Sequence, residues 1–302
     1  MEKANKRRGL ISVLVVLSII AFVGFSLVPI LDSILKGSQA QSRSTPTPTQ
    51  TAASNDQQSQ LLQDQVRGYE LVLQREPDNV TALRGLLQVR LELIGQGVGD
   101  IKDVVPTLEK LAKLNPETTE YGILLAQAKE RTADREGAAQ AYRSILASKP
   151  GEIKALQGLV NLLLVQQRPE AAIGLLQDTL KAAPAANLAK PESVDVTSVQ
   201  LILGQVYAVQ KRYEEAIAIY DESAKTNPKD FRPTLGKAIV LKEQGKTDEA
   251  KTLFDRATEL APPNYKDQIN QLASGTPSPS PATTTTPEPA ASPSPEGALP
   301  KP

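Results

Sequence analysis

Prolines recur at a nearly constant interval through the middle of this chain, and that interval constrains the fold more than any other feature. Three of the five intervals are 34 residues, and the other two are 39 and 44 residues. Because proline disfavours helix at the residue before it, we expect each of these prolines to end a helix. A period of this length indicates stacked helical repeats. The six prolines are Pro77, Pro116, Pro150, Pro184, Pro228 and Pro262.

The two longer intervals contain visible insertions. The first holds the turn-forming run GQGVGD at residues 95–100, and the second holds residues 187–196, with Pro191 inside them. The glycines of the first insertion also suggest a phosphate-binding loop. That run follows no predicted strand and lacks the Gly-Lys-Ser/Thr ending, so we interpret it as an inter-helix loop.

Residues within each interval follow one spacing, which is clearest in residues 197–230. There a Leu-Gly pair is followed by a tyrosine, an alanine, an aromatic residue and a proline: Leu203, Gly204, Tyr207, Ala216, Tyr220 and Pro228. Small side chains let paired helices approach, and large ones fill the gap to the next pair. This pattern resembles the tetratricopeptide repeat (TPR) family, with Gln200 where tryptophan is typical. The resemblance covers roughly residues 60–274 and implies an all-α, right-handed superhelical solenoid of about five repeats, a half repeat and a capping helix.

Composition and periodicity together divide the chain into blocks. A basic amino terminus precedes an apolar anchor, a linker rich in Ser, Thr, Pro and Gln follows, and a Pro/Ser/Thr-rich tail comes after the repeats. Neither the linker nor the tail has enough apolar residues to offset the entropy of ordering, so we expect both to be disordered, the tail partly as polyproline II. The predicted blocks are 1–8, 9–35, 36–58, 59–274 (half repeat 59–79, repeats 80–118, 119–152, 153–186, 197–230 and 231–264, capping helix 264–274) and 275–302.

The amino-terminal apolar run predicts a single transmembrane helix. Gly9 to Leu31 spans 23 residues without a charge. At 1.5 Å per residue this helix is about 34 Å long, enough to cross a hydrocarbon core of about 30 Å. Four basic residues precede the run and two follow it, which favours a cytoplasmic amino terminus and a periplasmic or thylakoid-lumenal repeat domain.

Three alternatives to this uncleaved signal-anchor stay open. The run could be a signal peptide cleaved after Ala40, although it is longer than the usual 7–15 apolar residues. The repeat domain could face the cytoplasm instead. The run could also be a buried helix of a soluble core, although nothing near it is amphipathic enough to cover it.

The composition argues against an enzyme and against nucleic-acid binding. The chain contains no His and no Cys, which removes the commonest general base, thiol nucleophiles and thiolate metal sites. It has 34 acidic and 34 basic residues, and only 4% of its residues are aromatic, so no basic field attracts a nucleic acid and few rings can stack on bases. We expect no cofactor, no metal and no small-molecule substrate.

What remains is the inner surface of the solenoid. In the TPR family, peptides bind along the surface formed by the first helix of each pair. Amide side chains both donate and accept hydrogen bonds, so a row of them can pair with a peptide backbone largely independently of its sequence. Lys154 and Asn161 also resemble a fragment of the family's clamp for a terminal carboxylate, but the companion residues are missing. The candidate binding residues are Arg84, Gln88, Gln127, Lys154, Gln157, Asn161, Gln205 and Arg232.

These features predict a membrane-anchored adaptor that binds unidentified protein partners and assists assembly or organisation of a membrane complex. The layout resembles anchored TPR proteins of cyanobacteria and chloroplasts that assist photosynthetic complexes. One alternative is a structural envelope protein whose solenoid self-associates. Another is a regulatory subunit of an envelope enzyme, against which the missing His and Cys argue.

Overall fold

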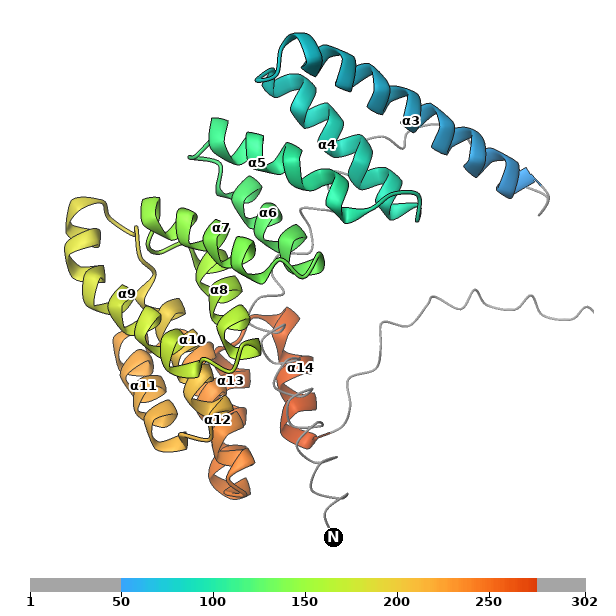
Figure 1. Ribbon diagram of the computed structural model, residues 1–302. Helices are drawn as coiled ribbons and strands as arrows, with labels where there is room; N and C mark the ends of the chain where they lie inside the picture. The colour runs from blue at the N-terminus through green and yellow to red at the C-terminus, as the bar shows by residue number, and fades with distance from the viewer. Residues whose placement is uncertain (1–49, 276–302) are drawn as a thin grey trace, which may run out of the picture.

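The computed structural model describes residues 50–275, and this part of the chain is entirely helical, with no strand. The prediction of an all-α solenoid is thereby confirmed for the described residues. Figure 1 shows the helices stacked side by side along a curved path from α3 to α14. The elements are α3 (Gln50–Arg75), α4 (Val80–Gly95), the 3₁₀ helix η2 (Ile101–Val104), α5 (Val105–Leu114), α6 (Thr119–Arg131), α7 (Arg135–Ser148), α8 (Ile153–Val165), α9 (Pro169–Ala189), α10 (Val196–Val209), α11 (Tyr213–Thr226), α12 (Phe231–Glu243), α13 (Thr247–Leu260) and α14 (Pro263–Ser274).

The helices form two layers. Within each pair the first helix packs antiparallel against the second, as α6 does against α7, α10 against α11 and α12 against α13. Successive first helices also contact one another directly, since α6 touches α8, α8 touches α10 and α10 touches α12. Successive second helices contact one another less. The layer of first helices is therefore on the inside of the curve.

One turn recurs between the first and second helices. Ala133, Gln167, Lys211 and Gly245 each adopt a positive φ of 59–79°, two residues after the end of the first helix. The following N–H then bonds a carbonyl five residues back, as in Arg212 N to Tyr207 O at 2.9 Å. This is the Schellman arrangement, which satisfies the last carbonyls of a helix. Only one of the four residues is glycine, the residue for which the conformation carries no steric cost.

Tyrosine rings lie on glycines of the next repeat. Tyr142 is buried, and a Cβ built on Gly158 would lie 2.2 Å from its Cζ. Tyr69 faces Gly85 and Tyr220 faces Gly236 in the same way, with would-be Cβ contacts of 2.4 Å and 2.7 Å. In all three pairs the glycine follows the tyrosine by 16 residues. The missing side chain therefore leaves the space into which a neighbouring ring packs.

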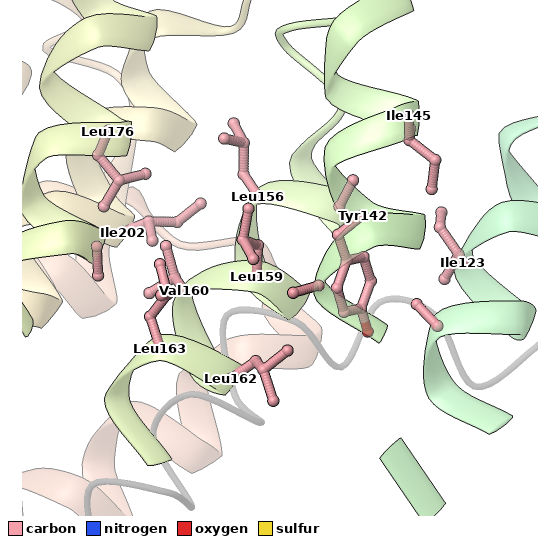
Figure 2. Packing of buried hydrophobic residues seen from close by; sticks show 14 of the residues in the cluster. Ile123, Tyr142, Ile145, Leu156, Leu159, Val160, Leu162, Leu163, Leu176 and Ile202 are labelled. Carbon is pink, nitrogen blue, oxygen red and sulfur yellow. The ribbon is translucent and has the colours of Figure 1, made fainter. Parts of the chain in front are cut away.

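The largest core cluster extends from α4 to α12, and smaller clusters lie between α3 and α4 and between α12 and α14. Figure 2 shows Tyr142 of α7 between Ile123 and Ile145 on one side and Leu156 and Leu159 of α8 on the other. The Tyr142 hydroxyl donates to Glu130 Oε1 at 2.7 Å, so the one polar atom of this ring is satisfied. Burial, together with this carboxylate, raises the pKa of Tyr142 well above its ordinary value. Each helix pair thus shares its apolar surface with its neighbours, as stacked repeats require.

Two predictions of helix limits were wrong. Pro184 does not end its helix but lies inside α9, which continues to Ala189. Asn187 then fixes the connection to α10, since its Nδ2 donates to Val194 O and its Oδ1 accepts from Val194 N, at 2.9 Å and 2.8 Å. The predicted linker 36–58 is also too long, because α3 begins at Gln50.

The predicted anchor at residues 9–35 and the predicted tail at 275–302 lie outside the described residues, except for Gly275, which caps α14 with a φ of 74°. Between residues 50 and 275, no helix has both the length and the apolar character needed to cross a membrane.

Candidate peptide-binding face

All eight candidate residues lie on first helices, and none of them is in the core. Arg84 and Gln88 are on α4, Gln127 is on α6, and the rest follow on α8, α10 and α12. Arg84, Gln88 and Gln127 are exposed, whereas the other five are half-buried. The surface of the first helices that carries these eight residues is called the inner face below.

Four of the eight are amides at equivalent places, and we call them the amide row: Gln88, Gln127, Asn161 and Gln205. Thr132, Gln166 and Gln210 cap the carboxyl ends of α6, α8 and α10, and each follows the amide of its helix by five residues. Gln88, Gln127 and Asn161 each follow the amino-terminal cap of their helix by nine residues. Equal depth along adjacent helices places the side chains in a line across the inner face.

The cations of the inner face differ in how they are held. The Arg84 guanidinium lies 5.9 Å from the ring centre of Tyr121, and Lys154 forms no ion pair within the described chain. Arg232 is already engaged, because its guanidinium bonds both oxygens of Asp230 at 2.6–3.0 Å and reaches Ser198 Oγ at 3.3 Å. The Asp230 hydrogen bonds raise the pKa of Arg232. Arg232 therefore holds α12 against α10, and is less free than Arg84 or Lys154 to meet a ligand.

Gln205 is the unusual member of the amide row. Its Nε2 atom is buried and has no hydrogen-bond partner within residues 50–275. An unpaired buried amide destabilises a fold by about 1–3 kcal/mol. Gln200, one turn earlier on α10, is only 4% exposed and its Oε1 is likewise unpaired. The sequence signalled Gln200 as a departure from the repeat pattern, but nothing in it signalled which end of Gln205 is buried.

A pocket lies outside the inner face and was not predicted. It is an open pocket of about 320 Å³ between α3, α4 and the loop that follows α4. Arg90 closes one side, bonding Glu70 Oε1 at 2.7 Å and Asp103 O at 2.6 Å. Its lining combines apolar and charged residues: Gln63, Val66, Arg67, Glu70, Arg90, Leu93, Ile94, Val98, Gly99 and Asp103.

The run at residues 95–100 forms a connection between helices. Gln96 caps α4, Gly97 takes a φ of 77°, and the Asp100 side chain caps η2 by accepting from Lys102 N at 2.9 Å. No strand precedes this run in the described chain. The interpretation as an inter-helix loop is confirmed.

Metal-ligating residues do not gather anywhere in residues 50–275: no group of three or more acidic side chains there is placed to hold an ion.

Stacked helix pairs that share their apolar surfaces and leave a polar inner face define a helical-repeat solenoid. The model of the tetratricopeptide repeat family matches residues 84–261, and the chain belongs to that family. The resemblance inferred from the proline spacing is thus confirmed.

Two curated proteins are similar to the chain in sequence. Protein SLOW GREEN 1, chloroplastic, from Arabidopsis thaliana is 32% identical over 195 residues, which cover 65% of this chain and 59% of that protein. Cellulose synthase operon protein C from Pseudomonas fluorescens (strain SBW25) is 25% identical over 168 residues, covering 56% of this chain and 13% of that protein. The chain therefore spans less than two thirds of either relative.

Among solved structures, yeast Tom70 covers 70% of this chain with a TM-score of 0.48 and 15% identity, and the match spans 42% of Tom70.

Proposed function

We propose that this protein is an adaptor that binds extended segments of partner proteins across its inner face. The observation that carries the proposal is the amide row, because four carboxamides recur at equivalent depth on the first helices and three of them have donors that are not buried. TPR proteins generally mediate protein–protein interactions, and this chain has the fold of that family.

The chemistry of the row suits a backbone ligand. A carboxamide offers two N–H donors and one acceptor oxygen, and rotation of the amide brings either end toward a ligand. Since every residue of an extended segment has a backbone carbonyl, such contacts depend little on the ligand's sequence. Arg84 and Lys154 flank the row and favour ligands that carry an acidic side chain. Sequence-tolerant capture of segments is what an assembly factor requires.

The amino-terminal run completes the proposal. With residues 9–35 as an uncleaved anchor, the inner face is held close to a membrane, where it assists assembly or organisation of a membrane complex. Four basic residues before the run support a cytoplasmic amino terminus and a periplasmic or lumenal repeat domain. The similarity to a protein named as chloroplastic supports a photosynthetic membrane as the setting.

Site-specific photo-crosslinking in the cells that make the protein tests the binding face. A photoreactive side chain at Asn161 on the inner face is compared with one at Asp178, which is exposed on the second helix α9. We expect protein adducts from position 161 that are lost when Gln127→Ala and Gln205→Ala are added, and none from position 178. Adducts of equal yield from both positions, or adducts from position 161 that the two alanines do not reduce, would show that the amide row is not the binding site.

A structural protein that self-associates through its solenoid is the second candidate. The exposed apolar side chains of α3, Leu61 at 59% and Leu71 at 60% exposure, favour it. Sedimentation of the full chain in detergent over a hundredfold range of concentration separates the two functions. A monomer throughout removes self-association, whereas oligomers that Leu61→Gln/Leu71→Gln dissociates would favour it.

A further inference from the structure

The amide row has a spacing that selects one ligand conformation. Successive first helices α6, α8, α10 and α12 pack against each other, and packed helix axes lie about 8–10 Å apart. A polyproline II helix has three residues per turn and rises about 3.1 Å per residue, so one turn advances about 9 Å. In a β-strand, residues on one face repeat about every 7 Å and fall out of step within two repeats. A polyproline II segment meets one amide per turn along the whole row.

Hydrogen-bond chemistry agrees with this geometry. A polyproline II backbone makes no internal hydrogen bonds, so its carbonyls are free to accept. Prolines in such a segment have no N–H, which leaves more acceptors than donors. The N–H groups of Gln88, Gln127 and Asn161 are donors for these carbonyls, whereas the Nε2 of Gln205 is buried.

The chain itself contains a proline-rich segment that begins after α14. Residues 276–302 contain nine prolines among 27 residues. These residues follow Gly275 directly. The end of α14 is held against the first helix α12, because Lys242 Nζ donates to Leu272 O at 2.5 Å and to Ala273 O at 2.9 Å. Lys242 lies one residue before the end of α12. Gln127, Asn161 and Gln205 lie five residues before the carboxyl-terminal caps of their helices, and five residues span only about 8 Å along a helix axis.

The length of this segment suffices. In polyproline II form, 27 residues span about 84 Å. Crossing from α12 back to α6 passes three intervals between first helices that contact one another, or about 24–30 Å, which leaves length to continue toward α4. The segment also carries Glu288 and Glu296 against the single cation Lys301, which suits an inner face that carries Arg84 and Lys154.

We propose that the inner face recognises proline-rich segments in polyproline II conformation and that residues 276–302 of the same chain occupy it. This inference rests on the proposed function and names the ligand class of that same site. A partner that uses the inner face then competes with the chain's own tail.

The first test is crosslinking within the purified full chain in detergent. A photoreactive side chain at Gln157, on the inner face beside the row, is compared with one at the exposed Lys181 of α9. We expect mass spectrometry to find links from position 157 to residues 276–302, and none from position 181. The links should disappear with Gln127→Ala/Gln205→Ala, and also when all nine tail prolines are replaced by alanine.

Mixing isotopically heavy and light copies identifies which copy supplies the tail. Links within one copy support the proposal, and links between copies would overturn it in favour of exchange between molecules. Absence of tail links from position 157, with adducts to other proteins from position 161 in cells, would overturn this inference but leave the proposed function standing. Absence of both kinds of product would overturn the two together.

A binding measurement gives the magnitude. A labelled synthetic peptide of residues 276–302 is titrated onto the full chain and onto a chain that ends at Gly275. A tethered segment has an effective concentration of about 1 mM, so a peptide that binds with a Kd of about 100 μM should bind the full chain about tenfold more weakly. Equal affinity for both chains would refute intramolecular occupation, and unchanged binding of an all-alanine peptide would refute polyproline II recognition.

Discussion

Gln205 should serve binding at the expense of stability, and replacing it with methionine separates the two roles. Methionine has nearly the same length and volume but no polar group that needs a hydrogen bond. The buried, unpaired Nε2 atom costs the native state about 1–3 kcal/mol, and Gln205→Met removes that cost. In a domain of this size 1 kcal/mol shifts Tm by about 2–4 °C, so we expect a rise of about 2–12 °C.

Binding should change in the opposite direction. Losing one hydrogen bond of about 0.5–1.5 kcal/mol weakens a peptide ligand by about two- to tenfold. The assay pairs thermal and urea denaturation, followed by circular dichroism, with titration of the 276–302 peptide onto the chain that ends at Gly275.

Gln200→Met is the matched control, because the Gln200 side chain is only 4% exposed, whereas Gln205 is half-buried on the inner face. We expect this variant to gain stability by a similar amount and to bind normally. The reasoning is refuted if Gln205→Met lowers Tm, or if both variants weaken binding equally.

Four further substitutions test the packing and the helix turns. Gly158→Ala should destabilise the fold by about 1–3 kcal/mol in urea titrations, because the added methyl group would displace the ring of Tyr142. Gly174→Ala has open space around it and should stabilise α9 by about 0.5–1 kcal/mol in the same assay. Pro184→Ala should raise the free energy of unfolding by about 1–3 kcal/mol, since it restores an N–H inside α9. A lower unfolding temperature in calorimetry would mean that the proline shapes the turn to α10. Lys211→Gly should raise the free energy of unfolding by at most about 1 kcal/mol, because glycine adopts a φ of 59° without strain. An unchanged Tm would show that the turn is unstrained.

Much of the architecture could be predicted because it depends on local spacing. Proline intervals, a 3.6-residue period and small residues at fixed offsets are properties of short segments, and they located the helices around Tyr207 and Tyr220. The insertion at residues 95–100 could be predicted for the same reason, since glycine marks turns wherever it clusters. The eight candidate residues lie on first helices, as the period required. That a partner binds them stays a prediction.

Errors arose where tertiary contacts outweighed a local signal. Pro184 disfavours helix locally, but the turns of α9 around it pack against α10, and Asn187 holds the chain only after the helix has continued. The left-handed turns at Ala133, Gln167 and Lys211 have no glycine to mark them, because helix packing on both sides fixes the conformation.

By itself the sequence determined the repeat, its helix pairs, the absence of His and Cys, and the amides that recur along the first helices. Only the tertiary structure decided that Tyr142 fills the space left by Gly158, and that the Nε2 atom of the half-buried Gln205 has no partner. The physical reason is distance. A helix's period fixes which face a residue occupies, but the depth at which its side chain ends depends on how closely neighbouring repeats pack, and that packing is a property of the whole stack.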